Sequence, residues 1–433
     1  MSAGQQRTHG STRRIARAIT SLVDEVTLAF IFRIFAQAAS FLLLARLLQP
    51  KGYGTLAALT GLVGLLVPFA GFGFGNLLAR DIALTGCAVP SMVKRTYVLI
   101  ALTLGPAAAV IGVVSTVVFG ADTLPLVMLL CVAELGCNAA TSNVASALLS
   151  YGQKRSYVWL QVVVSAGRLC AALILLTVPL ASRSPTLWAG IYLIFTAIIF
   201  WWARSQMSRS MSGAAPDEEG QSSPPGILAG LSFSVGLATR TVYDDIDKVM
   251  LAHYRGYTET AVYAAAYRAV QAASSPSLAL NAQLYPKYFQ AGCNGPRAVI
   301  RLTKSAMSRT LLLAFAAVAL VIIFRGVIAT WLGAGYEKVP GVVAALAFLP
   351  VLQSIHFVLG DAVTGMGRQS ARASAQVLSA LLNAGLNLWL IPNYGVVGAI
   401  LATAGSETAL SFVLLLIWMR SLGGLETRTC KET

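Results

Sequence analysis

The sequence predicts an all-α protein that crosses a lipid bilayer many times. Of its 433 residues, 56% are hydrophobic and only 11% are charged, whereas a soluble domain carries about 25% charged residues. The mean hydropathy is +0.71. Apolar runs of about 20 residues, the length of a transmembrane helix, follow one another along the chain, and no segment alternates with the two-residue period of a membrane β-barrel. A polytopic helical membrane protein is the class that fits.

About twelve spans are predicted, since twelve helices of about 20 residues need about 240 residues and the chain supplies them with loops to spare. In the first half we expect spans at residues 25–48, 56–79, 97–120, 124–149, 158–180 and 186–203. In the second half we expect them at 227–254, 261–285, 306–330, 340–360, 372–391 and 395–419.

A polar segment separates the two halves. Residues 204–226 are rich in Ser, Gly and Pro and have few apolar anchors, which is typical of a solvated linker. The expected organisation is a basic cytoplasmic N-terminus at 1–24, an N-terminal six-helix lobe at 25–203, a cytoplasmic linker at 204–226, a C-terminal six-helix lobe at 227–420 and a cytoplasmic tail at 421–433.

The distribution of Lys and Arg predicts that both termini face the cytoplasm. With the N-terminus inside, the opposite loops hold only Lys51, Arg183, Arg255 and Lys338, while most of the other basic residues fall on the inner side. Short loops rich in Lys and Arg stay cytoplasmic. This asymmetry accounts for most of the net charge of +15, so nucleic acid is not an expected partner. No cleavage site closes the first apolar run, which we therefore interpret as a retained helix.

The two halves share a topological pattern. A short basic outer loop containing glycine precedes Tyr53 in the first half and Tyr263 in the second, and each tyrosine is flanked by small residues. Six spans separate the two loops, so they fall on the same side of the membrane. That arrangement is a parallel repeat about an axis along the membrane normal.

Ionisable residues inside predicted spans indicate a polar cavity within the bundle, because such groups face the protein interior or water. Four arginines lie well inside spans and are candidates for binding an anion: Arg33, Arg168, Arg240 and Arg268. Guanidinium stays charged and forks onto phosphate oxygens. The alternative is that these arginines form structural ion pairs with carboxylates such as Glu134, Asp244 or Asp247, or reach to the membrane interface.

The seventh predicted span is unusually polar. At helical i,i+4 spacing, Arg240 faces Asp244, Asp244 faces Lys248, and Tyr243 faces Asp247. Such a helix either lines a substrate path and acts in gating, or neutralises its own charges so that it can insert.

Cofactor and metal chemistry is not predicted. None of the six cysteines forms a C-x-x-C pair, and the three histidines have no metal-ligand spacing. The predicted outer loops are about ten residues or fewer, whereas a membrane polymerase or glycosyltransferase usually carries a large outer loop with catalytic residues. We therefore expect no enzymatic activity, although an integral membrane enzyme is one alternative class.

Several short motifs resemble the polysaccharide transporter family, the O-antigen and exopolysaccharide flippases. They are Ala45 to Gly54 (ARLLQPKGYG), Gly71 to Arg80 (GFGFGNLLAR), Asp247 to Leu251 (DKVML), Val262 to Arg268 (VYAAAYR), Leu284 to Pro286 (LYP) and Gly395 to Ala399 (GVVGA). In the family's pattern, the proline ends helix eight. No single motif is specific, but their order and spacing match from about residue 24 to 420.

This resemblance implies a fold and a function. The family belongs to a superfamily that also contains multidrug antiporters and the peptidoglycan-precursor flippase. It implies twelve helices in two six-helix lobes around a central cavity, in the bacterial inner membrane, with transport by alternating access. The implied substrate is an undecaprenyl-pyrophosphate-linked oligosaccharide, and the expected partners are this substrate, membrane lipids and the polysaccharide polymerase machinery.

In such a transporter the four arginines would hold the pyrophosphate, since a glycan cannot cross hydrocarbon without replacing its hydration. Rocking of the two lobes would reorient the site. Glu134, Asp244, Asp247 and Asp361 are candidates for coupling to protons or sodium, or for gating. The rival within the superfamily is a multidrug or cation antiporter, which would favour acidic and aromatic cavity residues over buried arginines.

Overall fold

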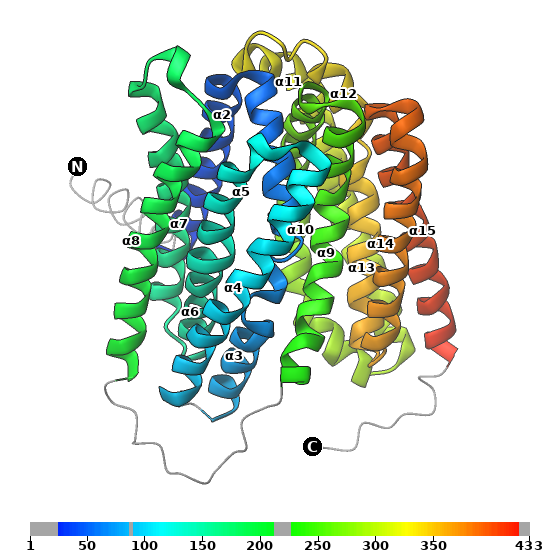
Figure 1. Cartoon of the computed structure of the whole chain (residues 1–433). Coiled ribbons are helices and arrows are strands. Elements are labelled where there is room, and N and C mark those ends of the chain that lie inside the picture. The colour runs from blue at the N-terminus through cyan, green and yellow to red at the C-terminus, as the bar shows by residue number, and fades with distance from the viewer. Residues whose placement is uncertain (1–24, 86–89, 212–226, 424–433) are drawn as a thin grey trace, which may run out of the picture. The chain divides into compact units, whose positions relative to one another are not determined.

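The computed structural model is helical, and the residues that it describes, 25–85, 90–211 and 227–423, include no strand (Figure 1). The all-α class is confirmed. The main helices of the first half are α2 (Glu25–Gly64), α3 (Phe74–Thr85), α4 (Pro90–Phe119), α5 (Leu124–Cys131), α6 (Ala139–Ser150), α7 (Lys154–Thr177) and α8 (Pro185–Met211). Those of the second half are α9 (Ile227–Arg255), α10 (Tyr257–Cys293), α11 (Pro296–Leu332), α12 (Val339–Leu346), α13 (Leu349–Gly365), α14 (Gln369–Tyr394) and α15 (Val396–Gly423).

Nine helical segments within the described residues are long and apolar enough to cross a membrane. They confirm a polytopic membrane protein, while the count of about twelve stays a prediction. Neither α9 nor α10 is among the nine. Helix α9 does not qualify because it is too polar. One stretch of it contains Arg240, Asp244, Asp245, Asp247 and Lys248.

The helices group into two compact units. Within the described residues, unit one comprises 25–43, 69–109 and 128–232, and unit two comprises 44–68, 110–127 and 233 to 423. The chain therefore passes between the units several times in its first half. The lobe boundaries expected from the sequence stay a prediction.

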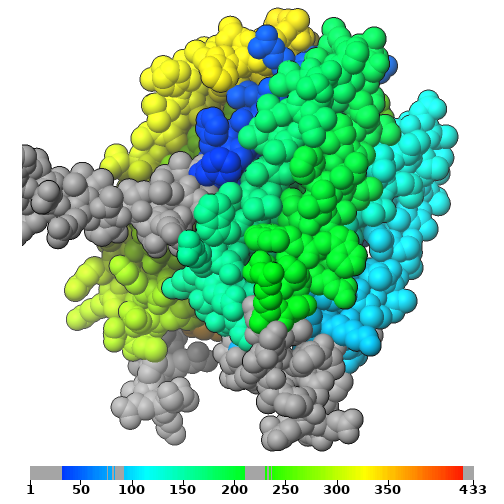
Figure 2. Space-filling model, turned by 90° about the vertical axis from the view of Figure 1, so that its left-hand side faces the viewer, coloured from blue at the N-terminus to red at the C-terminus, as the bar shows by residue number. Residues whose placement is uncertain are grey.

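Unit one has its core where α3, α4, α6, α7 and α8 meet. Phe74, Leu77, Leu148 and Leu160 are at most 1% exposed there. Figure 2 shows the face on which α7 and α8 lie side by side. The outward side chains of α8 include Ile194, Ile198 and Trp201, each about 60% exposed. Large apolar side chains on an outer face fit hydrocarbon as the surrounding solvent.

Unit two has its core between α10, α11, α13 and α15. Tyr288, Val299 and Val358 are nearly or fully buried in it. Figure 1 shows α13, α14 and α15 running next to one another, and α14 packs along α15. These helices surround the site described below.

The first two predicted spans differ from the observed helices. Instead of a loop at 49–55, α2 continues to Gly64 with a sharp break at Gln49, whose φ is 59°. Pro50 explains the break, because a proline disfavours the helical conformation of the preceding residue. The predicted span 56–79 is interrupted at Val67–Gly73, where Gly71 and Phe72 have positive φ. There Thr103 of α4 accepts a hydrogen bond from the Gly71 amide at 2.9 Å.

The expectation that a helix ends at Pro286 is wrong. Helix α10 runs through both Pro276 and Pro286 to Cys293. A proline inside a long helix removes one backbone hydrogen bond, and packing against neighbouring helices in a membrane compensates for that loss. The contacts of α10 with α11 and α13 supply such packing.

Candidate functional site

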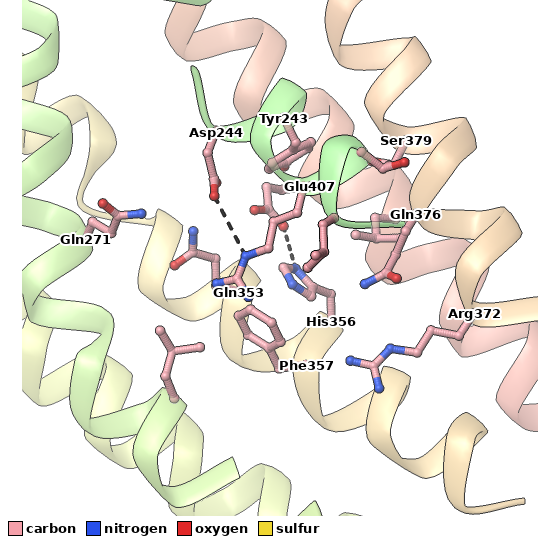
Figure 3. Close-up of a pocket in the computed structure, with 15 residues that line it drawn as sticks. Tyr243, Asp244, Gln271, Gln353, His356, Phe357, Arg372, Gln376, Ser379 and Glu407 are labelled. Atoms are coloured by element: carbon pink, nitrogen blue, oxygen red, sulfur yellow. Dashed lines mark hydrogen bonds and ion pairs between the residues drawn. The ribbon is translucent and has the colours of Figure 1, made fainter. Parts of the chain in front are cut away.

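A polar cavity of about 210 Å³ lies inside unit two (Figure 3). Side chains from α9, α10, α13, α14 and α15 line it. Its polar lining consists of Thr239, Arg240, Tyr243, Asp244, Gln271, Gln353, His356, Arg372, Gln376, Ser379 and Glu407. Pockets that bury a drug-sized ligand measure about 300–1,000 Å³, so this one suits part of a larger molecule.

A buried pair of side chains, His356 and Glu407, forms one wall of the cavity. His356 Nδ1 of α13 lies 2.6 Å from Glu407 Oε2 of α15, and the two side chains are 9% and 1% exposed. Figure 3 shows Tyr243 of α9 next to Glu407. The Tyr243 hydroxyl accepts from the Ser406 hydroxyl at 3.4 Å. A carboxylate so far from water needs a partner, and the imidazole supplies it.

Two arginines line the same cavity, and they differ in how tightly other side chains hold them. Arg240 is an exposed side chain whose Nε lies 3.8 Å from Asp244 Oδ2. Arg372 donates from Nη1 to Asp361 Oδ1 at 2.8 Å and to Thr364 Oγ1 at 3.0 Å. Arg372 is therefore fixed by two acceptors, while Arg240 keeps most of its donors available for a ligand.

Three glutamines add neutral donors and acceptors. Gln271 projects from α10, Gln353 from α13 and Gln376 from α14, and Figure 3 shows them around the same space. Each amide both donates and accepts hydrogen bonds. Together with Ser379 and Phe357 they form a surface suited to a hydroxyl-rich molecule that also has apolar faces.

A second polar cluster lies deeper between α9 and α10. Tyr263 donates to Asp247 Oδ2 at 2.5 Å, and the Lys248 amide donates to Asp247 Oδ1 at 2.7 Å. The Lys248 ammonium donates to Asp245 Oδ1 at 2.8 Å and to the Asp244 carbonyl, and it lies 4.6 Å from the Tyr267 ring centroid. Asp247 and Lys248 are 2% and 7% exposed, so the lysine neutralises its own helix.

Unit one holds a comparable cluster built on a π-helix. Glu134 lies in the π-helical segment Val132–Asn138. Its Oε1 accepts from Arg168 Nη2 at 2.8 Å and from the Tyr192 hydroxyl at 2.9 Å, while Oε2 accepts from Asn138 at 2.7 Å. π-Helical turns occur often at functional sites. Here the turn directs Glu134 toward α7 and α8.

Comparison with known proteins identifies the family of this chain. A model of the polysaccharide biosynthesis protein family matches residues 26–291, more than half of the sequence. The chain belongs to this family. The probable low-salt glycan biosynthesis flippase Agl15 of Haloferax volcanii is 24% identical over 164 residues, which are 37% of this chain and 35% of that protein. The chain thus matches only about a third of that relative's length.

The fold resembles that of solved multidrug transporters. An inward-facing MATE transporter of the MOP superfamily matches with a TM-score of 0.68 and 14% identity, over 94% of this chain and 100% of that chain. A MOP superfamily transporter from Pyrococcus furiosus matches with a TM-score of 0.55 and 14% identity, over 98% and 94%. At this identity the likeness concerns the fold.

In this member of the polysaccharide biosynthesis family, the four predicted arginines are distributed over both units. Arg33 is half-buried on α2 and Arg168 is bound to Glu134, both in unit one. Arg240 lines the cavity of unit two, and Arg268 is exposed on α10 within electrostatic range of Tyr53. Within unit two, only Arg240 of the predicted arginines lines this cavity, and their role in binding stays a prediction.

The predicted carboxylates also differ in the partners that they contact. The expected i,i+4 pair of Arg240 and Asp244 is confirmed. Lys248, however, contacts the backbone carbonyl of Asp244 rather than its carboxylate, and Asp247 bonds Tyr263 rather than Tyr243. The tertiary contact with α10 outcompetes the local spacing.

Sequence reasoning missed the pair of His356 and Glu407. Glu407 carried a signal, because an ionisable residue inside a span is a functional candidate. Its partner lies 51 residues away, and no periodicity connects them. Among the described residues, no group of three or more His, Cys, Asp or Glu side chains has the geometry of a metal site.

Proposed function

We propose that this protein is a transporter, not an enzyme, and that it moves a lipid-linked oligosaccharide across the membrane. The family is one of polysaccharide biosynthesis, the relative Agl15 is named a glycan biosynthesis flippase, and the fold is that of membrane transporters. The observation that carries the proposal is the polar cavity of unit two. A glycan needs such a lining, since its hydroxyls lose water on leaving the aqueous phase.

The proposed substrate is an oligosaccharide on undecaprenyl pyrophosphate. Arg240 is the proposed anchor for the pyrophosphate in unit two, because its guanidinium is exposed and only loosely held by Asp244 at 3.8 Å. Arg33, Arg168 and Arg268 remain candidates for the same role. Arg168 is the weakest of them on its contacts, since Glu134 and Tyr192 already occupy its donors.

The three glutamines are the proposed glycan contacts. Gln271, Gln353 and Gln376 come from three different helices, so a sugar bound among them would contact α10, α13 and α14 at once. In transport by alternating access, the sugar would have to leave these three glutamines when the cavity opens to the other side of the membrane. The lipid tail would stay in hydrocarbon throughout.

For cation coupling, the contacts favour a pair that the sequence did not suggest. Glu134, Asp247 and Asp361 contact Arg168, Lys248 and Arg372. Arginine and lysine are lasting cationic partners for a carboxylate. Glu407 contacts instead a histidine, the residue type that most often takes up and releases protons in proteins. We therefore propose His356 and Glu407 as the coupling site, ahead of Asp244, which shares the cavity.

Several further features belong to the same proposal. The location would be the bacterial inner membrane, with both termini cytoplasmic and a cytoplasmic linker at 204–226. The product would be an O-antigen or another exopolysaccharide, and the polymerase machinery would be a partner. The asymmetric distribution of Lys and Arg supports the orientation.

The second candidate function is a multidrug or cation antiporter. The structural likeness to a MATE transporter favours it, as do the acidic and aromatic residues Asp244, Glu407, Tyr243 and Phe357 in the cavity. The arginines and amides of the same cavity favour an anionic, hydroxylated substrate. The two candidates differ in what crosses the membrane, which can be measured.

The test is transfer of a fluorescent undecaprenyl-pyrophosphate oligosaccharide between the leaflets of proteoliposomes. We expect transfer above protein-free vesicles, reduced about tenfold by Arg240→Ala, as the loss of one charge-assisted contact predicts. Arg309→Ala, an exposed arginine of α11, is the matched control and should transfer normally. Absence of transfer together with proton- or sodium-driven dye efflux would establish the antiporter instead.

A further inference from the structure

Unit two contains a second cavity, of about 510 Å³, at the end opposite the N-terminus of α9. Three connections supply its rim, those between α9 and α10, between α11 and α12, and between α14 and α15. The apolar segments Val339–Gly365, Gln369–Tyr394 and Val396–Leu422 each have one end here. The cavity therefore lies at the level where the hydrocarbon core gives way to lipid head groups.

Specific contacts hold the rim in place. Arg255 donates from Nη2 to the Pro392 carbonyl at 2.9 Å and from Nε to the Ile391 carbonyl at 3.3 Å. The buried Tyr336 donates to the Ala45 carbonyl at 3.0 Å. Gly395 has φ 58°, and a Cβ there would lie 2.9 Å from Glu259 Oε2. A rim fixed in this way is preformed, so a ligand does not have to order it.

The rim presents charges of both signs. Lys338 and Glu259 both line the cavity, and neither has an ion-pair partner among the residues that the structure describes. Glu337 accepts a hydrogen bond from the Gly335 amide at 2.8 Å. That amide lowers the pKa of Glu337, so the rim keeps this negative charge. The complementary ligand carries an anion and a cation close together.

Below the rim the wall is apolar. Val342 and Ala345 of α12 and Val397 and Ile400 of α15 continue the cavity toward the hydrocarbon. Val397 is 58% exposed, which places it on the surface that faces lipid. An occupant with a charged head and a hydrocarbon body matches this order, whereas a free sugar or inorganic phosphate would leave the apolar wall uncovered.

We propose that this cavity binds one zwitterionic phospholipid, with its phosphate at Lys338, its ammonium at Glu259, and an acyl chain along Val342, Ala345, Val397 and Ile400. The site is separate from the transport cavity, because the two share no lining residue. It stands whether or not the proposed transport function is correct. A zwitterionic lipid gives Lys338 and Glu259 each a partner of opposite charge, whereas an anionic lipid gives no partner to Glu259.

The test is lipid retention by the full-length protein, purified in mild detergent, delipidated and titrated with phosphatidylethanolamine or phosphatidylglycerol under native mass spectrometry. We expect one phosphatidylethanolamine per protein, bound about tenfold more tightly than phosphatidylglycerol because of the second ion pair. Lys338→Glu and Glu259→Lys should each weaken this binding about tenfold. Lys304→Glu, an exposed lysine on α11, is the matched control and should bind normally.

The wild-type comparison tests the proposal even when a variant fails to fold. Equal binding of the two lipids by the wild type would overturn the assignment of Glu259 to the ammonium. Unchanged binding by folded Lys338→Glu and Glu259→Lys would overturn the site itself, and so would binding of free phosphoethanolamine as tight as that of the whole lipid. Thermal unfolding of each variant establishes that it is folded.

Discussion

At the scale of single residues, the ion pairs within the two units distinguish carboxylates that stabilise the fold from those proposed to act in transport. Glu134 and Asp361 each lie 2.8 Å from an arginine, and Asp247 is enclosed by Lys248 and Tyr263. Burying these charges costs desolvation free energy, and the short contacts between the partners offset that cost. With such a partner, a carboxylate can lie inside the helix bundle without binding an ion from solution.

The cluster around Glu134 yields a stability prediction. Arg168→Met should lower the free energy of unfolding by about 2 kcal/mol, because Glu134 would lose a charged hydrogen bond while remaining buried. Thermal unfolding in detergent measures this. The double variant Arg168→Met with Glu134→Gln should recover most of the loss, since no unpaired charge remains.

The same pair of variants tests the role of Arg168 in transport. If the arginine only neutralises Glu134, the double variant should transport normally. Loss of transport by a folded double variant would return Arg168 to the group that holds the substrate's head group.

The pair of His356 and Glu407 yields a prediction about coupling. Glu407→Gln preserves the shape of the cavity and removes the carboxylate that contacts His356. We expect transport in proteoliposomes to lose its response to an imposed pH gradient while transfer down the substrate gradient persists. The matched control is Asp122→Asn, an exposed carboxylate that lines neither cavity of unit two, and it should keep the response. A pH-gradient response retained by Glu407→Gln would contradict the assignment.

At the scale of elements, helix breaks coincide with places where the chain changes units. The chain passes from unit one to unit two at residue 44, close to the break at Gln49, and returns at residue 69, next to the break at Ala70–Phe72. Helix α4 crosses at 110, and Pro106 lies four residues before that crossing, although the helix continues through it. Breaks of this kind are where a helix can absorb changes in backbone angle.

Rules that act over a few residues account for some of the observed features and not for others. The break before Pro50 and the pair of Arg240 with Asp244 follow from rules that act over a few residues. The π-helical turn at Glu134 and the pairing of His356 with Glu407 depend on helices that meet only after folding. The ending expected at Pro286 failed for the same reason, because neighbouring helices support α10 beyond the proline.

Close packing of α2 on α10 yields a prediction at the element scale. A Cβ at Gly54 would lie 1.7 Å from the Tyr257 carbonyl oxygen, so Gly54→Ala must separate the two helices. Overpacking of this kind costs about 1–3 kcal/mol, and we expect a lower melting temperature. Gly105→Ala on α4, where a Cβ would meet nothing within 4 Å, should raise the melting temperature slightly, because alanine favours helix. Equal melting temperatures for the two variants would contradict the close approach.

At the scale of the whole molecule, hydrocarbon is the solvent that the sequence specifies. Helix α11 exposes Leu312 at 71%, Ile323 at 70% and Trp331 at 62%, which in water would form an aggregating surface. The polar residues are gathered inside the units and at the helix ends. The family assignment and the fold agree with this distribution, since the proposed translocation of a glycan needs a polar interior within an apolar exterior.

The orientation of the chain in the membrane gives the last prediction. The two ends of α8 should lie on opposite sides of the membrane, with Ser182, just before the helix, outside and Ser208, in its last turn, inside. The reason is that the basic residues concentrate on the side of Ser208. Both serines are exposed. In a variant without its six cysteines, a membrane-impermeant maleimide applied to intact spheroplasts should label Ser182→Cys and leave Ser208→Cys unlabelled until the membrane is opened. Labelling of Ser208→Cys alone would invert the predicted topology.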